Sequence, residues 1–289
     1  DLQFLRFFSY AWWLVTMEPL SQNFEYNIVN LCNKSGIGIM SVQFNRPRVK
    51  NAFNDACYEE LISVFKLAGE DERISCIILT GMGDFFSSGA DVKTSFSRTK
   101  EEYEAMGSLE HSPAGRFKLA IMRCPKLVVA AVNGPAVGIG ATLLAHCDLV
   151  FMSSEAYLWA PFFQLALVPE HCSSLLFPLI MGQGRAGRVL YLGEKLGAQE
   201  ALDCGFITKI LPSTSNILEE TQNAMEEILR KPLAAMTSVI FKQLLRGTRL
   251  TYMEETVKSE LAILTQRIKR GDPAQTLKST IKSKHQSKL

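Results

Sequence analysis

Hydrophobic and polar positions alternate through residues 26–44, where two apolar runs flank the segment Asn-Lys-Ser-Gly. A period of two on both sides of such a turn predicts a β-hairpin. Residues 55–71 follow a different pattern, because their apolar positions recur at helical spacing. The residues on the predicted apolar face are Leu61, Val64, Phe65 and Ala68. The chain therefore changes from strand to helix within its first seventy residues or so.

Short, continuous apolar runs at 75–81 and 126–132 are typical of buried strands, and two further strands are expected at 148–154 and 156–160. A helix-rich stretch is expected over 99–123. After Cys172 the pattern is mostly helical, apart from a short strand within "FITKIL". The last expected helices are 214–230, 233–246 and 250–269. Alternating elements followed by a group of helices predict an α/β fold with a helical carboxyl-terminal region.

These patterns divide the chain into four parts. The expected parts are an N-terminal extension over 1–24, a core over 25–212, a helical region over 213–284 and a tail over 285–289.

Composition narrows the class of protein. Apolar residues make up 47% and charged residues 21%, which suits a globular core. The net charge of +2 indicates no nucleic-acid partner. The seven cysteines are scattered, odd in number and never spaced as CxxC, so we expect buried thiols in a reducing compartment and no zinc site.

The two ends of the sequence carry separate signals. The apolar stretch near the start is too short to span a bilayer, and Arg6 argues against a signal peptide, so we expect no membrane partner. The chain begins with Asp, which leaves open a longer natural N-terminus. Ser287, Lys288 and Leu289 form the tripeptide read by the peroxisomal import receptor. The alternative is a basic tail that ends in this way by chance.

Two glycine-containing turns are the first candidates for chemistry. "FFSSGADVK" follows the strand at 75–81, and "NGPAVGIGATLL" follows the strand at 126–132. Turns after strands expose backbone N–H groups, and two neighbouring turns would aim two of them at one oxygen, as an oxyanion hole does. Each turn taken alone is better explained as a tight turn without a ligand. Neither has the spacing of a dinucleotide fingerprint or of a phosphate-binding P-loop.

Four segments in order, "RPRVKNAF", "FSSGADVK", "AAVNGPAVGIGATLLAHCDLVF" and "VPEHCSS", resemble the signature segments of the crotonase (enoyl-CoA hydratase/isomerase) superfamily. The similarity runs from about residue 25 to the last helices. "PEHCSS" and the terminal "SKL" fit best the branch of peroxisomal 3,2-enoyl-CoA isomerases. The resemblance implies a ClpP-like fold of repeated β-β-α units, with carboxyl-terminal helices that assemble a homotrimer or hexamer. It also implies an acyl-CoA thioester as substrate.

The resemblance also assigns residues to the site. The N–H groups of Ala90 and Ile139 would form the oxyanion hole, and Phe162 would belong to an apolar wall. The residues that would line the path of the CoA moiety are Arg48, Lys50, Ala52, Phe53, Ser88, Gly89 and Asp91. Arg48 and Lys50 either meet CoA phosphates or remain solvated loop charges.

Departures from the hydratase pattern favour an isomerase. Hydratases of this family hold a water between two glutamates, and the matching positions are Thr142 and Phe162. Glu170 stands where hydratases typically have glycine, so one carboxylate would move a proton from carbon 2 of a 3-enoyl thioester to carbon 4. The oxyanion hole would hold the dienolate oxygen, and no metal or redox cofactor is required.

Other roles remain open for these residues. Glu170 would also suit the start of a helix, where a carboxylate interacts favourably with the helix dipole. Glu155 is a rival acid in a turn-like segment, His146 is expected to pack in a buried helix, and His171 would tune Glu170. Asp148 would cap or turn the chain before its strand.

Three alternative functions also remain. One is a hydratase or thioester hydrolase of the same fold. Another is an inactive CoA-binding module, as in chromodomain Y-like corepressors. The third is the catalytic half of a longer chain that carries an acyl-CoA-binding domain.

Overall fold

The computed structural model describes residues 24–34, 37–91, 94, 102, 108–213, 216–273 and 275–276. The expected extension lies almost wholly outside these residues, and the tail with Ser287, Lys288 and Leu289 lies entirely outside them. So does most of the first part of the helix-rich stretch, over 99–107.

Nine strands are found in the described part of the chain. They are β1 (Asn27–Lys34), β2 (Ile37–Phe44), β3 (Ile74–Gly81), β4 (Leu127–Val132), β5 (Ala136–Val137), β6 (Leu149–Ser153), β7 (Tyr157–Trp159), β8 (Leu196–Gly197) and β9 (Lys209–Leu211). The predicted hairpin is confirmed, because β1 and β2 pair antiparallel from Asn27 opposite Phe44 to Lys34 opposite Ile37. The apolar runs after it form strands as well, as predicted.

The helices of the described residues occupy the connections and the carboxyl-terminal region. They are α1 (Asp55–Glu70), α4 (Pro113–Arg123), α5 (Ile139–Thr142), α6 (Ser173–Met181), α7 (Gln183–Gly187), α8 (Ala198–Asp203), α9 (Ile217–Leu229) and α10 (Ala234–Arg270). The short 3-10 turns are η1 (Pro47–Val49), η2 (Leu109–His111), η3 (Leu143–His146) and η4 (Phe163–Leu165), and the π-helical turn η5 spans Arg188–Leu192.

Two sheets organise these elements. The larger sheet has six strands in the order β1-β2-β3-β4-β6-β9, and from β2 onward its neighbours pair in parallel. The smaller sheet has the order β5-β7-β8. Because β3 and β4 are parallel neighbours, the segments that follow them both leave the large sheet at the edge formed by the carboxyl ends of these strands. Both glycine-containing turns therefore begin at this edge.

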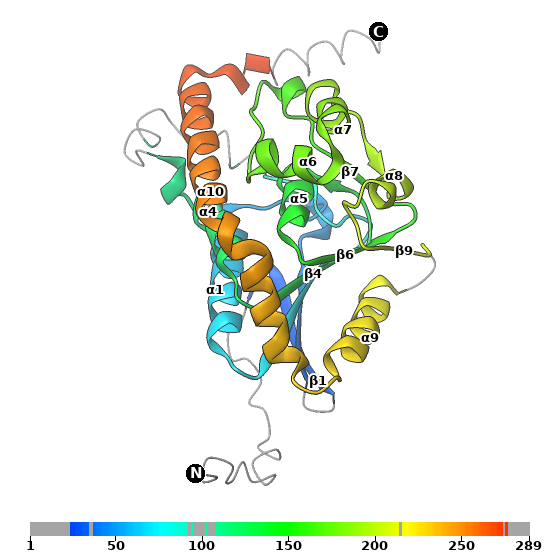
Figure 1. Cartoon of the computed structure of the whole chain (residues 1–289). Helices are drawn as coiled ribbons and strands as arrows, with labels where there is room; N and C mark the ends of the chain where they lie inside the picture. The colour runs from blue at the N-terminus through cyan, green and yellow to red at the C-terminus, as the bar shows by residue number, and fades with distance from the viewer. Residues whose placement is uncertain are drawn as a thin grey trace.

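Both faces of the large sheet are buried, which explains the continuous apolar runs in its central strands. Ile77 and Leu79 of β3 face a cluster shared with α1 and α4, whereas Cys76 and Ile78 face a cluster shared with α9. In Figure 1, α1 and α9 accordingly lie on opposite sides of the strands. The helix predicted at 55–71 is confirmed as α1, and its four predicted apolar positions are all buried.

The predicted break between helices 233–246 and 250–269 is wrong. A single helix, α10, continues through this region and contacts α4, α6 and α9 on its way (Figure 1). Gly247 lies inside it without ending it, since tertiary contacts along a long helix outweigh the cost of about 1 kcal/mol for one internal glycine.

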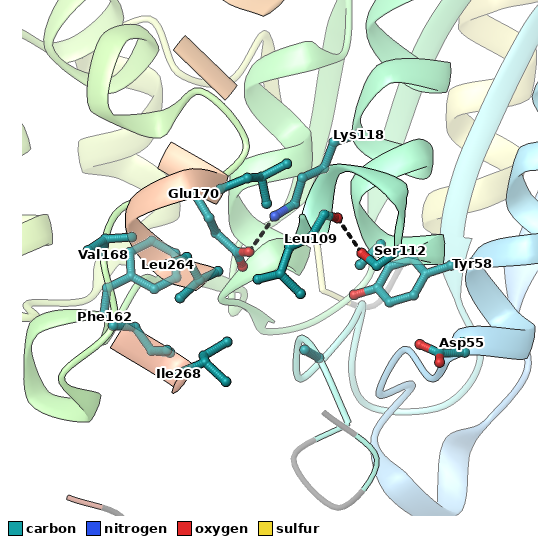
Figure 2. A pocket seen from close by; sticks show the side chains of 14 residues that line it. Asp55, Tyr58, Leu109, Ser112, Lys118, Phe162, Val168, Glu170, Leu264 and Ile268 are labelled. Atoms are coloured by element: carbon teal, nitrogen blue, oxygen red, sulfur yellow. Dashed lines mark hydrogen bonds and ion pairs between the residues drawn. The ribbon is translucent and has the colours of Figure 1, made fainter. Parts of the chain in front are cut away.

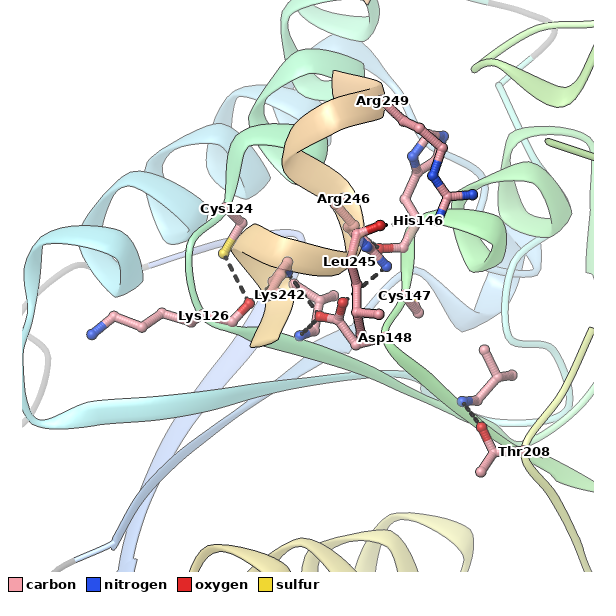
Figure 3. Close-up of polar contacts among 12 residues, drawn as sticks. Cys124, Lys126, His146, Cys147, Asp148, Thr208, Lys242, Leu245, Arg246 and Arg249 are labelled. Carbon is pink, nitrogen blue, oxygen red and sulfur yellow. Dashed lines mark hydrogen bonds and ion pairs between the residues drawn. The ribbon is translucent and has the colours of Figure 1, made fainter. Parts of the chain in front are cut away.

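Asp148 anchors α10 to the large sheet and does more than the predicted turn or cap (Figure 3). One of its carboxylate oxygens accepts hydrogen bonds from the Val128 N–H at 2.8 Å and from the Lys242 ammonium at 2.8 Å. The other lies 2.9 Å from the Arg246 guanidinium. The side chains of Asp148 and Lys242 are 13% and 6% exposed, so the two charges are largely removed from water and depend on each other.

The described residues also show the state of the cysteines and the apolar character of the helices. All seven cysteines lie within the described residues, and each is a free thiol. Over the same residues, none of the helices combines the length and the apolar character needed to cross a bilayer.

We expect Asp148→Asn to lower the free energy of unfolding by about 3 kcal/mol, because two cations lose their counterion. Lys242→Met should cost less, since Asp148 keeps Arg246 and the Val128 N–H. Urea denaturation measures both effects. Asp84→Asn, at an exposed turn position, is the matched control. A cost for Asp148→Asn no larger than that of the control would contradict this account.

Candidate active site

The two glycine-containing turns lie against each other. Ser87 and Ala136 form a parallel β-bridge, and the Val137 N–H donates to the Ser87 carbonyl at 2.8 Å. Gly89 has a φ of +93°, and a Cβ at this position would lie 2.8 Å from the Val137 carbonyl oxygen. Only glycine allows the two backbones to approach so closely.

The predicted oxyanion donors are the first N–H groups after the glycines at the contact between the turns. Gly138, with a φ of +55°, precedes Ile139, and Gly89 precedes Ala90. The N–H groups of Ala90 and Ile139 donate to no acceptor among the residues that the structure describes. Both are therefore available to a ligand oxygen, although Ala90 is exposed and the Ile139 side chain is buried in the core.

The expected CoA-binding segments lie side by side through their backbones. The Phe53 N–H donates to the Gly89 carbonyl at 2.8 Å, and the Asp91 N–H donates to the Phe53 carbonyl at 2.9 Å. The Ser88 N–H similarly donates to the Lys50 carbonyl at 2.8 Å. The Phe53 ring itself is 1% exposed and packs against other aromatic rings, so its contribution outside the core is made by the backbone.

The charged candidates in this region differ in their surroundings. Arg48 is exposed, and the Lys50 ammonium lies 4.7 Å from the centre of the Phe85 ring. Asp91 forms an ion pair with Arg46 at 3.1 Å, and Ala52 is buried. Arg48 and Lys50 thus stand at the surface of the loop, which is where both of their predicted roles require them.

A pocket between α1, α4, η2, the 162–170 segment and α10 brings several candidates together (Figure 2). The empty space between its lining residues, with the solvent at its mouth included, is about 730 Å³. The apolar lining residues are Ala90, Leu109, Ala114, Phe162, Leu167, Val168, Leu261, Leu264 and Ile268. The polar ones are Asp55, Tyr58, Ser112, Lys118 and Glu170. Of the predicted residues, the pocket collects Glu170, Ala90 and Phe162, and Ile139 is not among its lining residues.

Glu170 meets a buried lysine in this pocket. The Lys118 ammonium lies 2.6 Å from Glu170 Oε2, and the two side chains are 2% and 18% exposed. Figure 2 shows the two side chains pointing toward each other, from α4 and from the loop before α6. Both side chains are largely withdrawn from solvent, and this charge-assisted hydrogen bond holds one carboxylate oxygen of Glu170 in place.

The loop that carries Glu170 is held by α10. His171 and Cys172 have φ values of 56° and 62°, a left-handed conformation that costs non-glycine residues of order 1–3 kcal/mol. Helix α6, which begins immediately afterward, has no side-chain cap of its own. Instead, Glu260 of α10 accepts from the N–H groups of Cys172 at 2.7 Å and Ser174 at 3.1 Å. A carboxylate here satisfies orphan N–H groups at the helix start and so keeps the strained loop in place.

His146 and His171 form a buried pair behind this loop. Their rings stack with centroids 4.1 Å apart, and His146 Nε2 donates to the His171 carbonyl at 2.8 Å. Burial lowers the pKa of His146 to about 3 and that of His171 well below its usual value. Both rings are therefore neutral near pH 7. His146 packs as expected, while His171 supports the Glu170 loop through its backbone.

Sequence reasoning missed Lys118, Tyr58 and Glu260. Lys118 had a recognisable signal, because it lies at i+4 from Ala114 and i−4 from Met122, on the apolar stripe of α4. A charge in such a stripe has to find a partner inside the protein. Glu155, the rival acid, lies exposed in the turn between β6 and β7. Among the described residues, no three histidine, cysteine or acidic side chains gather as metal ligands.

Comparisons with known proteins identify the family. The sequence profile of the family described as enoyl-CoA hydratase/isomerase matches residues 34–281. The chain belongs to the enoyl-CoA hydratase/isomerase family. This membership confirms the resemblance predicted from the four sequence segments.

Among the similar members of this family are two proteins that are named as isomerases. The chain is 33% identical over 252 residues to "Enoyl-CoA delta isomerase 3, peroxisomal" of Mus musculus, covering 87% of this chain and 78% of that protein. It is 35% identical over 232 residues to "Enoyl-CoA delta isomerase 2" of Rattus norvegicus, covering 80% of this chain but 58% of that protein. The chain thus spans little more than half the length of the rat relative.

A solved structure confirms the predicted crotonase fold of this family. The enoyl-CoA hydratase/isomerase of Pseudoalteromonas atlantica superposes with a TM-score of 0.78 at 30% identity, covering 88% of this chain and 97% of that one. The positions predicted to match the two hydratase glutamates are Thr142 and Phe162, and both side chains are buried, at 0% and 3% exposed.

The buried histidines predict a loss of stability in acid. The unfolded chain takes up a proton on His146 near its ordinary pKa of 6.5, whereas the folded chain resists until about 3. The free energy of unfolding therefore keeps its full value above pH 6.5. It declines as the pH falls toward 3, at about 1.4 kcal/mol per pH unit for each such group.

We expect His146→Gln, which keeps an N–H donor but cannot titrate, to reduce this decline. Urea denaturation between pH 7.5 and pH 4.5 measures it, with the exposed His111→Gln as the control. An unaltered pH dependence in His146→Gln would contradict the assignment.

Proposed function

We propose that this protein isomerises 3-enoyl-CoA to trans-2-enoyl-CoA, in the β-oxidation of unsaturated fatty acids, with Glu170 as its acid-base residue. The observation that carries the proposal is the Glu170 carboxylate in a pocket that Ala90 and Phe162 also line. The isomerase names of the mouse and rat relatives support the same reaction.

The reaction needs one base and a place for negative charge. The Glu170 carboxylate takes a proton from carbon 2, and the electrons delocalise over the dienolate to the thioester oxygen. The N–H groups of Ala90 and Ile139 donate to that oxygen, and such donors stabilise charge as it develops. The Glu170 carboxyl then returns the proton to carbon 4, so that no proton or electron is gained or lost.

The lack of two carboxylates separates this reaction from hydration. The hydratases that this chain resembles hold and activate a water with two glutamates, and the matching positions here are Thr142 and Phe162, neither of which is a carboxylate. Phe162 and Val168 line the pocket near Glu170 and offer a water molecule no hydrogen bond from their side chains (Figure 2). We therefore propose isomerisation rather than hydration or thioester hydrolysis.

The CoA moiety would lie along the segments 48–53 and 88–91, with Arg48 and Lys50 available to its phosphates. The exposure of both cations supports this path. The mechanism calls on the substrate and the protein's own side chains, and on no metal or redox cofactor.

Assembly and location form part of the same proposal. We propose a homotrimer or hexamer that associates through α10. Its exposed apolar residues support this, and they include Met236, Ile240, Phe241, Leu244 and Leu245.

We also propose a peroxisomal location, which the name of the mouse relative supports. Removal of Ser287–Leu289 from a fluorescently tagged chain should leave it in the cytosol, and unchanged import would contradict the role of this tripeptide.

We expect Glu170→Gln to lower kcat for 3-hexenoyl-CoA by about 10²- to 10⁴-fold, the usual contribution of general acid–base catalysis. The amide keeps the shape of the side chain but cannot take up the proton. A spectrophotometric assay with 3-hexenoyl-CoA and 2-hexenoyl-CoA separates isomerisation from hydration.

Glu155→Gln is the matched control and should keep full activity, because this carboxylate lies outside the pocket. Retained isomerisation in Glu170→Gln would reject Glu170 as the base, and exclusive conversion of 2-hexenoyl-CoA would reject the isomerase itself.

A further inference from the structure

Lys118 is a charged side chain at a buried position of α4, where an apolar residue would be expected. It lies on the apolar stripe of α4 and is 2% exposed, and its ammonium contacts the Glu170 carboxylate. A buried ion pair contributes little net stability, because removing both ions from water costs about as much as their attraction returns. Stability alone therefore does not account for a lysine at this position.

The ammonium engages only one of the two carboxylate oxygens. It lies 2.6 Å from Glu170 Oε2, and no contact to Oε1 is found within the described residues. Oε1 is the oxygen left to a ligand in the pocket that Glu170 lines. The carboxyl group would otherwise rotate about its terminal bond, which has a broad torsional preference.

We propose that Lys118 is a positioning residue that holds Glu170 through Oε2 and assigns the proton transfer to Oε1. This inference rests on the proposed isomerase function. A single fixed oxygen that faces both carbon 2 and carbon 4 removes and returns the proton without a rotation between the two steps. Orientation of this kind is a large part of the advantage that bound reactants have.

Asp55, at the start of α1, is the other carboxylate that lines this pocket, and it lies away from the ion pair, beyond Tyr58 (Figure 2). The remaining titratable groups around the pair do not take over the role of Lys118 either. Tyr58 reaches the same pocket from α1, and burial raises its pKa well above its usual value, so it stays neutral. His171 and His146 are neutral near pH 7 because burial lowers their pKa values. Glu260 faces this region from α10, but it is engaged by the N–H groups of Cys172 and Ser174.

The test compares Lys118→Met, which removes the charge at similar length, with Lys118→Arg, which keeps it. We expect Lys118→Met to lower kcat for 3-hexenoyl-CoA by about 10²-fold, as a misplaced catalytic group does, with KM near the wild-type value. Lys118→Arg, which keeps a charged N–H donor for Oε2, should recover most of the lost turnover.

The matched control is Lys66→Met, the same change at an exposed position of α1, which should leave kcat and KM unaltered. In a Glu170→Gln background, Lys118→Met should have no further effect, since there is no base left to position. Lys118→Gln serves as a second uncharged variant if Lys118→Met does not fold.

The outcomes separate the two proposals. A wild-type enzyme without isomerase activity would refute the function itself. Activity that is lost in Glu170→Gln but kept in Lys118→Met would overturn the role of Lys118 alone. A loss in Lys118→Met that Lys118→Arg does not recover, or that adds a further loss in the Glu170→Gln background, would also overturn it, because a merely structural lysine gives that result.

Discussion

A charge that leaves water inside this protein must meet an opposite charge or a set of N–H donors. Three such arrangements join α10 and the loop before α6 to the rest of the fold. Asp148 pairs with Lys242 and Arg246, Glu260 caps the start of α6, and Lys118 pairs with Glu170. Each of them holds a segment whose own residues would not keep it in place.

These arrangements are connected. Arg246, which pairs with Asp148, also donates to the His146 carbonyl at 2.7 Å, and His146 donates to the His171 carbonyl. His171 is the residue after Glu170. Hydrogen bonds through His146 therefore connect α10 to the loop that carries the proposed base. The long helix is thus part of the support of the site.

The site itself is divided between two kinds of structure. Backbone groups supply the proposed oxyanion donors, since Gly89 and Gly138 let two turns touch at the edge of the large sheet. Side chains supply the proposed base and its partner, from a strained loop and from the apolar stripe of α4. Backbone donors fixed by a sheet need no side chain to orient them, whereas a carboxylate on a loop does.

Local patterns in the sequence determined most of the secondary structure: the hairpin, α1, the buried strands, and the two turns with their glycines. Ordered motifs also determined the family, because four segments at suitable spacing leave few alternatives. Only the tertiary structure decided that α10 is one helix, because its packing against other elements outweighs the internal glycine. Only the tertiary structure likewise decided that Lys118 meets Glu170 and that Glu260 caps α6, because these two contacts join residues 52 and 88 positions apart. The periodic pattern of a sequence indicates which residues are buried. Which residue pairs with a buried charge depends on how segments distant in the sequence pack together.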